Sequence, residues 1–214
     1  MLIAQSQIQA RLADAYTAGQ LDAGMRLLVE TQAILRPAQD LAMADAVAGA
    51  LLERETPAPM KADALASVFA KIDALPPRPL KSEQFLDEVM KLPAPIRAAA
   101  LESLETRGWK FGGPGIRILQ LALENSALTE LVRVEPGFAA PNHTHDAGEF
   151  TLVLTGALLD ERGRYAVGDI AYADASVTHT PKAEHGDVCW NLAISEAPLV
   201  LTGPLGLIQK LLPN

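Results

Sequence analysis

The sequence predicts an α+β protein in which an N-terminal all-α helical bundle precedes a C-terminal antiparallel β-barrel. The first 75 residues contain 19 alanines and three glycines, and their apolar residues recur at helical spacing. Residues 76–95 carry five prolines, which mark a linker. After the sequence GWKFGGPG the apolar period shortens to that of a strand. We therefore expect a helical domain over 1–75, a proline-containing linker with short helices over 76–108, and the barrel over 109–214.

Four helices are expected in the N-terminal domain, over about 5–18, 22–35, 38–54 and 61–74. Gly19 is suited to end the first helix, and Asp22 is suited to cap the second. The last helix carries an apolar face that we expect to be buried, made of Leu65, Val68, Phe69 and Ile72. A half this rich in alanine has few bulky side chains for its own core, so its helices are expected to pack against something more, such as a partner protein.

Two further helices are expected in the linker. The stretch SEQFLDEVMKL predicts a short amphipathic helix with Ser82 as its N-cap. Its apolar side would be made of Phe85, Val89 and Leu92. A second helix is expected from about Ile96 to Thr106.

The sequence of the second half predicts a series of short strands. Ile116 and Ile118 begin it, and the runs ALTELVRV, EFTLVLTG, DVCWNLAI and PLVLTG continue it. Turn residues separate the runs, at 135–137 and again at 161–163. Many short strands at regular spacing are typical of a β-sandwich or a β-barrel.

The histidines suggest a metal site, because all four lie between 143 and 185. His143, His145 and Glu149 share one parity, so on a strand their side chains would point to the same face. His179 is the fourth candidate, thirty residues after Glu149. Three nitrogens and one carboxylate oxygen suit zinc, iron, manganese, nickel or copper, and ligand type alone does not choose among them. His185 stands outside this pattern and is expected to face solvent.

The spacing of these residues resembles the paired motifs of the cupin superfamily. The first motif, Gly-x5-His-x-His-x3-Glu-x6-Gly, is matched at every defined position from Gly137 to Gly156. The second is matched in its spacing and in Gly168 and His179. It departs from the superfamily pattern at three positions, Asp174, Ser176 and Ala183. Over about 110–205 the resemblance implies a small antiparallel cupin barrel (a double-stranded β-helix) with one interior metal.

The whole chain resembles the ChrR family of zinc-containing anti-sigma factors. Matching stretches include AYTAG from Ala15, LVET from Leu28, and EFTLVL from Glu149. The segment GDI from Gly168, leading to HTP from His179, is also similar. The resemblance implies that the N-terminal helices bind an extracytoplasmic-function sigma factor, keep it from RNA polymerase, and release it under oxidative stress. It also makes zinc the expected metal of the barrel, with iron, manganese or nickel as the alternatives.

The family it resembles holds a further zinc in its helical domain, through an early histidine and a His-x3-Cys-x2-Cys stretch. The corresponding positions here are Gln7, Gln32, Arg36 and Gln39. None of these side chains replaces imidazole or thiolate as a zinc ligand. We therefore expect no zinc in the N-terminal domain. The helices would then pack without zinc, depend on the barrel or on a partner, or be a relic that has lost sigma binding.

Three functions compete at this point. The first is an anti-sigma factor with a cupin sensor domain. The second is a cupin metalloenzyme, an oxygenase or an isomerase, with a vestigial helical domain; the absence of a clear acid or base behind the metal ligands counts against it, and no catalytic residue is assigned. The third is a binding module whose barrel holds a small ligand. A homodimer is compatible with all three.

Composition narrows the partners and the compartment. The net charge of −8 and the pI near 5.0 disfavour a nucleic-acid binder, because no basic face is available to neutralise phosphates. A lone cysteine, Cys189, fits a reducing compartment. We interpret it first as a core residue, with a role as an oxidant sensor as the alternative. The N-terminus has no basic region before a long apolar run, so no signal peptide or membrane span is expected. The expected location is the cytoplasm.

Overall fold

The protein is described by a computed structural model over residues 5–37, 46–47, 49–76, 79–197 and 199–202. The helices with full bounds are α1 (Gln5–Thr17), α2 (Ala23–Leu35), α4 (Ala64–Asp73), α5 (Leu86–Val89) and α6 (Ala94–Thr106). The strands are β1 (Lys110–Gly113), β2 (Ile116–Gln120), β3 (Leu128–Val134), β4 (His143–His145), β5 (Glu149–Thr155), β6 (Ala157–Asp160), β7 (Gly163–Ala166), β8 (Ile170–Ala173), β9 (Lys182–Ala183), β10 (Cys189–Ser195) and β11 (Leu199–Leu201). None of the described helices is long and apolar enough to cross a membrane.

The strands form three antiparallel sheets. Six strands pair in the order β1-β2-β3-β10-β5-β8, three pair as β7-β6-β9, and β4 pairs with β11. Single bridges pair His143 of β4 with His179, and Lys182 of β9 with Ala139. Among the described strands no sheet closes on itself, so the prediction of antiparallel β structure is confirmed while a closed barrel is not observed.

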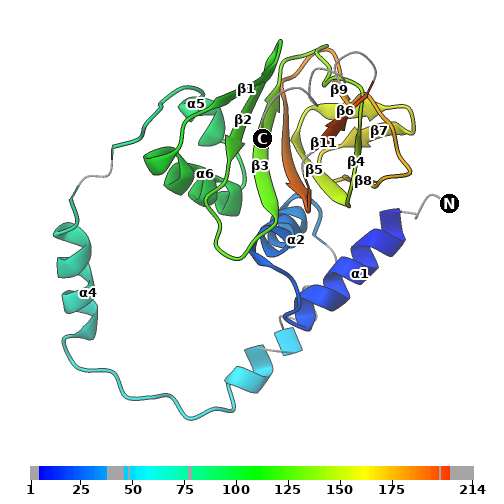
Figure 1. Cartoon of the computed structure of the whole chain (residues 1–214). Coiled ribbons are helices and arrows are strands. Elements are labelled where there is room, and N and C mark those ends of the chain that lie inside the picture. Colours follow the sequence, from blue (N-terminus) through cyan, green and yellow to red (C-terminus); the bar gives the residue numbers. More distant parts are fainter. Residues whose placement is uncertain (1–4, 38–45, 48, 77–78, 198, 203–214) are drawn as a thin grey trace.

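The large sheet separates two apolar cores because its side chains alternate between its faces. On β5, Leu152 and Leu154 join the core under the helices, whereas Val153 joins the core on the opposite face. On β10, Trp190 and Cys189 divide in the same way. In Figure 1, α2 and α6 lie against this sheet, and α4 stands apart from it.

Most of the expected helices are confirmed. Helices α1, α2, α4 and α6 lie within a few residues of their predicted bounds, and the Oδ1 atom of Asp22 accepts a hydrogen bond from the backbone N of Met25 at 2.8 Å, as expected of an N-cap. The predicted helix over 38–54 falls partly outside the described residues, and of its remainder 46–47 and 49–52 are helical.

The predicted burial of the α4 apolar face is wrong. Leu65 is 70% exposed, Phe69 is 56% exposed, and α4 has no buried residue at all. The helical spacing is correct, but no described residue covers the face.

The short linker helix starts later than expected. Helix α5 begins at Leu86, and Phe85 before it has a left-handed φ of 61°. The Phe85 ring packs edge-on against Trp109 at 5.6 Å and lies 4.2 Å from the guanidinium carbon of Arg133. Ser82 instead accepts a hydrogen bond from the backbone N of Gln84 at 3.2 Å. These long-range ring contacts hold Phe85 outside the helix, and a pattern of local spacing does not register them.

Candidate metal centre

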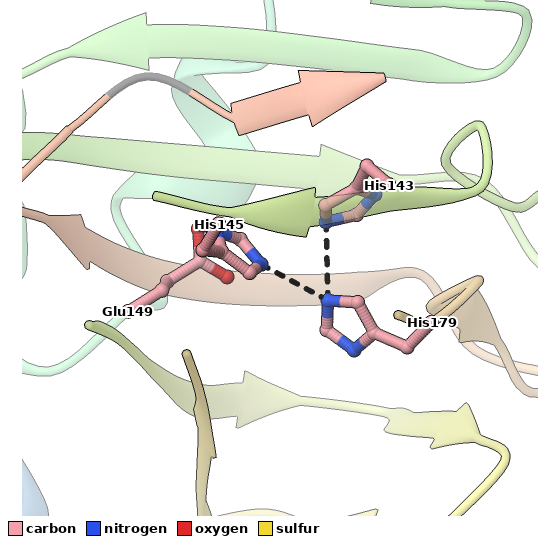
Figure 2. A group of neighbouring side chains, drawn as sticks. All are labelled: His143, His145, Glu149 and His179. Carbon is pink, nitrogen blue, oxygen red and sulfur yellow. Dashed lines mark hydrogen bonds and ion pairs between the residues drawn. The ribbon is translucent and has the colours of Figure 1, made fainter. Parts of the chain in front are cut away.

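Two strands and one loop bring the predicted ligands together (Figure 2). His143 and His145 lie two residues apart on β4, so both side chains point to one buried side while Thr144 between them is only half-buried. Glu149 begins β5, which belongs to a different sheet. His179 comes from the loop before β9, and its backbone pairs with that of His143.

The structure brings the four predicted residues together, but not through equal parity alone. Equal parity along one strand holds for His143 and His145, but the chain turns between His145 and Glu149 and changes sheet. The carboxylate therefore reaches the two imidazoles from a strand of the large sheet and not from β4. Parity could not predict this, although the motif spacing did.

The four side chains could together hold one metal ion. One ligand atom from each of His143, His145, Glu149 and His179 lies within 4.8 Å of every other. The Nε2 atom of His179 lies 3.1 Å from Nε2 of His143 and 3.2 Å from Nε2 of His145. Two nitrogens each about 2.1 Å from one ion and about 100° apart would lie about 3.2 Å from each other. The spacing therefore fits a single shared ion.

The hydrogen bonds behind two of the rings fix which nitrogen faces the site. The Nδ1 atom of His143 lies 2.7 Å from the carbonyl oxygen of Pro141, so Nδ1 carries the proton and donates it. The Nδ1 atom of His179 lies 3.3 Å from Oδ2 of Asp160, which assigns its proton in the same way. Both Nε2 atoms then face each other as bare lone pairs, an arrangement that a cation relieves and a hydrogen bond cannot.

Burial favours the neutral form of His143 and His145. Desolvation lowers the pKa of His143, outweighing its hydrogen bond to Pro141, and desolvation likewise lowers the pKa of His145 against the opposing pull of Glu149. A neutral imidazole is the form that binds a metal, so the site needs no proton release from these rings at neutral pH. The Nδ1 atom of His145 is buried without a hydrogen-bond partner, lying 3.7 Å from Oε2 of Glu149.

Two hydroxyl groups orient the carboxylate of Glu149. Ser195 on β10 donates to Oε2 at 2.8 Å, and Thr151 on the same strand as Glu149 donates to Oε1 at 3.1 Å. The carboxylate is mostly buried, with 15% of its side chain exposed. Both oxygens thus have a donor that holds them in place beside His145.

The structure adds a residue that the sequence analysis missed. Asp160, at the end of β6, lies behind His179 and is 1% exposed. Burial would raise the pKa of Asp160, but hydrogen bonds from His179 and Arg162 outweigh it and lower the pKa to about 2. Arg162 also forms an ion pair with Asp160 at 2.7 Å. The expectation of no acid behind the ligands is therefore wrong, and no motif spacing could have revealed a residue that reaches His179 from another hairpin.

The remaining candidates have no place at this centre. Burial raises the pKa of the Cys189 thiol to about 11, so it is protonated at neutral pH and behaves as a core residue. His185 is exposed, as expected. Of the positions aligned with the family's helical zinc ligands, Gln7 is exposed and Gln39 lies outside the described residues, while Gln32 and Arg36 contact the turn between β7 and β8.

Comparison with known proteins places this geometry in a family. A model of the ChrR cupin-like domain matches residues 98–196. Over 190 residues the chain is 36% identical to the anti-sigma-E factor ChrR of Cereibacter sphaeroides, and the match covers 88% of each chain. The chain also matches the crystal structure of Rhodobacter sphaeroides SigE in complex with the anti-sigma ChrR, with a TM-score of 0.60, 35% identity, and coverage of 87% of this chain and 96% of that one.

The similarity therefore takes in the N-terminal helices as well as the sheets. The sheet-rich region has a cupin-like fold, and the predicted order of helices before sheets is confirmed. At this identity and coverage, the chain belongs to the ChrR family.

Proposed function

We propose that the chain is an anti-sigma factor whose N-terminal helices, within 1–75, bind an extracytoplasmic-function sigma factor and withhold it from RNA polymerase. One observation carries this proposal: the similarity to ChrR extends through the helices, and ChrR was crystallised in complex with the sigma factor SigE. The protein would act in the cytoplasm, where RNA polymerase works.

The exposed apolar face of α4 supports a binding role for these helices. It consists of Leu65, Val68, Phe69 and Ile72, each of which is more than half exposed. Four such side chains on one helical face are unusual on a free surface and typical of a protein-binding one. Full burial of each would contribute on the order of 1.5–3 kcal/mol. We assign this face to the sigma-binding surface.

The cupin-like domain would hold one divalent ion, zinc by family resemblance, on His143, His145, Glu149 and His179. The facing lone pairs and the spacing of the three Nε2 atoms support this assignment. When bound, the ion would cross-link β4, β5 and the loop that carries His179. The protein's own part is to hold His143 and His145 neutral and to orient the carboxylate of Glu149. We also propose that the three sheets complete a cupin barrel around this centre.

Coexpression tests the partner. The chain is produced with the extracytoplasmic-function sigma factor encoded nearest to its gene and analysed by size-exclusion chromatography with light scattering. We expect one-to-one coelution. Separate elution of the two proteins would contradict the proposal.

Substitutions on α4 test the surface. Phe69→Glu places a charge in the apolar face, and Ser67→Glu places the same charge on the opposite, exposed side of the helix. We expect Phe69→Glu to weaken sigma binding at least about tenfold, since one large apolar contact is lost and a charge is desolvated. Ser67→Glu should bind like the unmodified chain. Equal binding by both variants would remove α4 from the surface.

A further inference from the structure

The C-terminal end of α2 is fastened to the cupin-like domain by three polar contacts. The buried side chain of Gln32 donates from Nε2 to the carbonyl oxygen of Gly168 at 3.0 Å. Arg36 donates from Nε to the carbonyl oxygen of Val167 at 3.0 Å, and its Nη1 pairs with Oδ1 of Asp169 at 2.6 Å. All three contacts fall on one turn, between β7 and β8.

This turn is shaped to receive the helix. Gly168 has a φ of +82°, which favours glycine, and a Cβ there would lie 2.6 Å from Cγ of Arg36. The backbone N of Ala166 donates to Oδ2 of Asp169 at 2.8 Å, so the carboxylate holds the turn with one oxygen and Arg36 with the other. The arginine stem thus packs directly on the turn backbone.

The N-terminal end of α2 is fastened to the same domain. Oδ1 of Asp22 caps the helix, while Oδ2 accepts a hydrogen bond from the backbone N of Ala127 at 3.0 Å. The backbone N of Gly24 donates to Oγ of Ser126 at 3.0 Å. Ser126 and Ala127 lie just before β3, which is three strands away from β8 in the order of the large sheet.

Apolar side chains fill the space between these two ends. Leu27, Leu28 and Val29 of α2 are buried in the core that lies under the helices and on the large sheet. Ile8 and Leu12 of α1 are buried in the same core. Helix α4, in contrast, buries none of its residues, so α1 and α2 take their packing from the cupin-like domain and not from α4.

We propose that α1 and α2 form one folding unit with the cupin-like domain, and that these two helices of the sigma-binding region depend on this docking for their structure. The domain boundary would then fall after α2, near residue 37, in place of residue 75. The inference rests on the proposed function only in naming these helices as sigma-binding; the docking itself is tested without a sigma factor.

Hydrogen exchange of the full chain tests the fastening. In Gln32→Ala/Arg36→Ala, two hydrogen bonds and an ion pair to the β7–β8 turn are lost. We expect backbone amides of α2 to exchange about 30-fold faster or more, since local opening becomes easier, with β3 and β10 unchanged. The control is Arg164→Ala, which removes an exposed ion pair to Glu184 and leaves the three contacts of Gln32 and Arg36 in place. Unchanged exchange in α2 of the double variant would overturn the proposal.

Cleavage of the folded chain is a second test, and it does not depend on whether the Gln32→Ala/Arg36→Ala variant folds. A protease recognition sequence is inserted after Ala58, in an exposed stretch between the helical residues at 49–52 and α4. We expect 1–58 and the remaining fragment to coelute after cleavage, because α1 and α2 stay docked. Separation of the fragments would overturn the proposal. Coelution without any sigma binding would leave this docking intact and contradict the anti-sigma function alone.

Discussion

Asp160→Asn is the substitution that most sharply tests the polar support of the metal centre. The Oδ2 atom of Asp160 contacts Nδ1 of His179 at 3.3 Å and the guanidinium of Arg162 at 2.7 Å. Its Oδ1 atom accepts hydrogen bonds from the backbone N of Arg162 at 2.8 Å and of Gly163 at 3.2 Å. Asparagine keeps the shape and an oxygen acceptor but removes the charge. The change therefore removes the charge together with one of the two acceptor oxygens.

The size of the effect follows from the pKa and from the contact to His179. A pKa lowered from 3.8 to about 2 corresponds to about 2 kcal/mol of preference for the ionised form in the folded protein, and Asp160 is buried enough for that preference to count in full. We expect the metal-free variant to lose about 2 kcal/mol of unfolding free energy at pH 7. Loss of a carboxylate behind a metal-binding histidine lowers metal affinity by about 10–100-fold.

Two assays measure these effects. Urea unfolding at pH 7 gives the stability of the metal-free protein, and competition with a chelator gives the zinc affinity. Asp187→Asn serves as the control, because Asp187 is exposed and away from the ligands. Zinc affinity and stability that both match those of the control would refute the role given to Asp160.

Three further predictions concern the ligands, the linker and the metal. His145→Ala should empty the centre, and a metal content still near one ion per chain would refute the ligand assignment. Glu88→Gln should lower stability by about 1–3 kcal/mol at pH 7, since Glu88 accepts hydrogen bonds from Arg133 and Trp190 that outweigh its desolvation and lower its pKa. That difference should be present above the ordinary pKa of 4.5 and vanish as pH falls below the lowered value; a constant difference from pH 7 to 2 would contradict it. Chelation of the metal should lower the unfolding temperature, because the ion binds only the folded chain, and an unchanged temperature would exclude that linkage.

The candidate ligands were predictable because motif spacing belongs to the chain itself. His143 and His145 share a face because they lie two positions apart on one strand. Glu149 and His179 reach them from another sheet and from a loop, and family resemblance supplied what local geometry could not. Asp160 has no such spacing to the ligands along the chain, so only the fold could show that it supports His179.

The helices also show that local spacing does not reveal contacts with distant residues. Periodicity located α4 correctly, but the same four apolar residues would read identically whether the protein's own core or a partner covers them. Strand β1 was not predicted, because KFGG has two glycines and no alternation; its pairing with β2 in a hairpin makes it a strand. Phe85 lies outside its predicted helix, and its ring contacts Arg133 and Trp109, which are distant in sequence.

The central claim is that this chain keeps a sigma factor from RNA polymerase. In vitro transcription tests it with the purified sigma factor encoded nearest to the gene, core RNA polymerase and a promoter that this sigma factor recognises. We expect the transcript to disappear when the chain is added at one equivalent of sigma factor, and to return when more sigma factor is supplied. Undiminished transcription in the presence of excess chain would contradict the account.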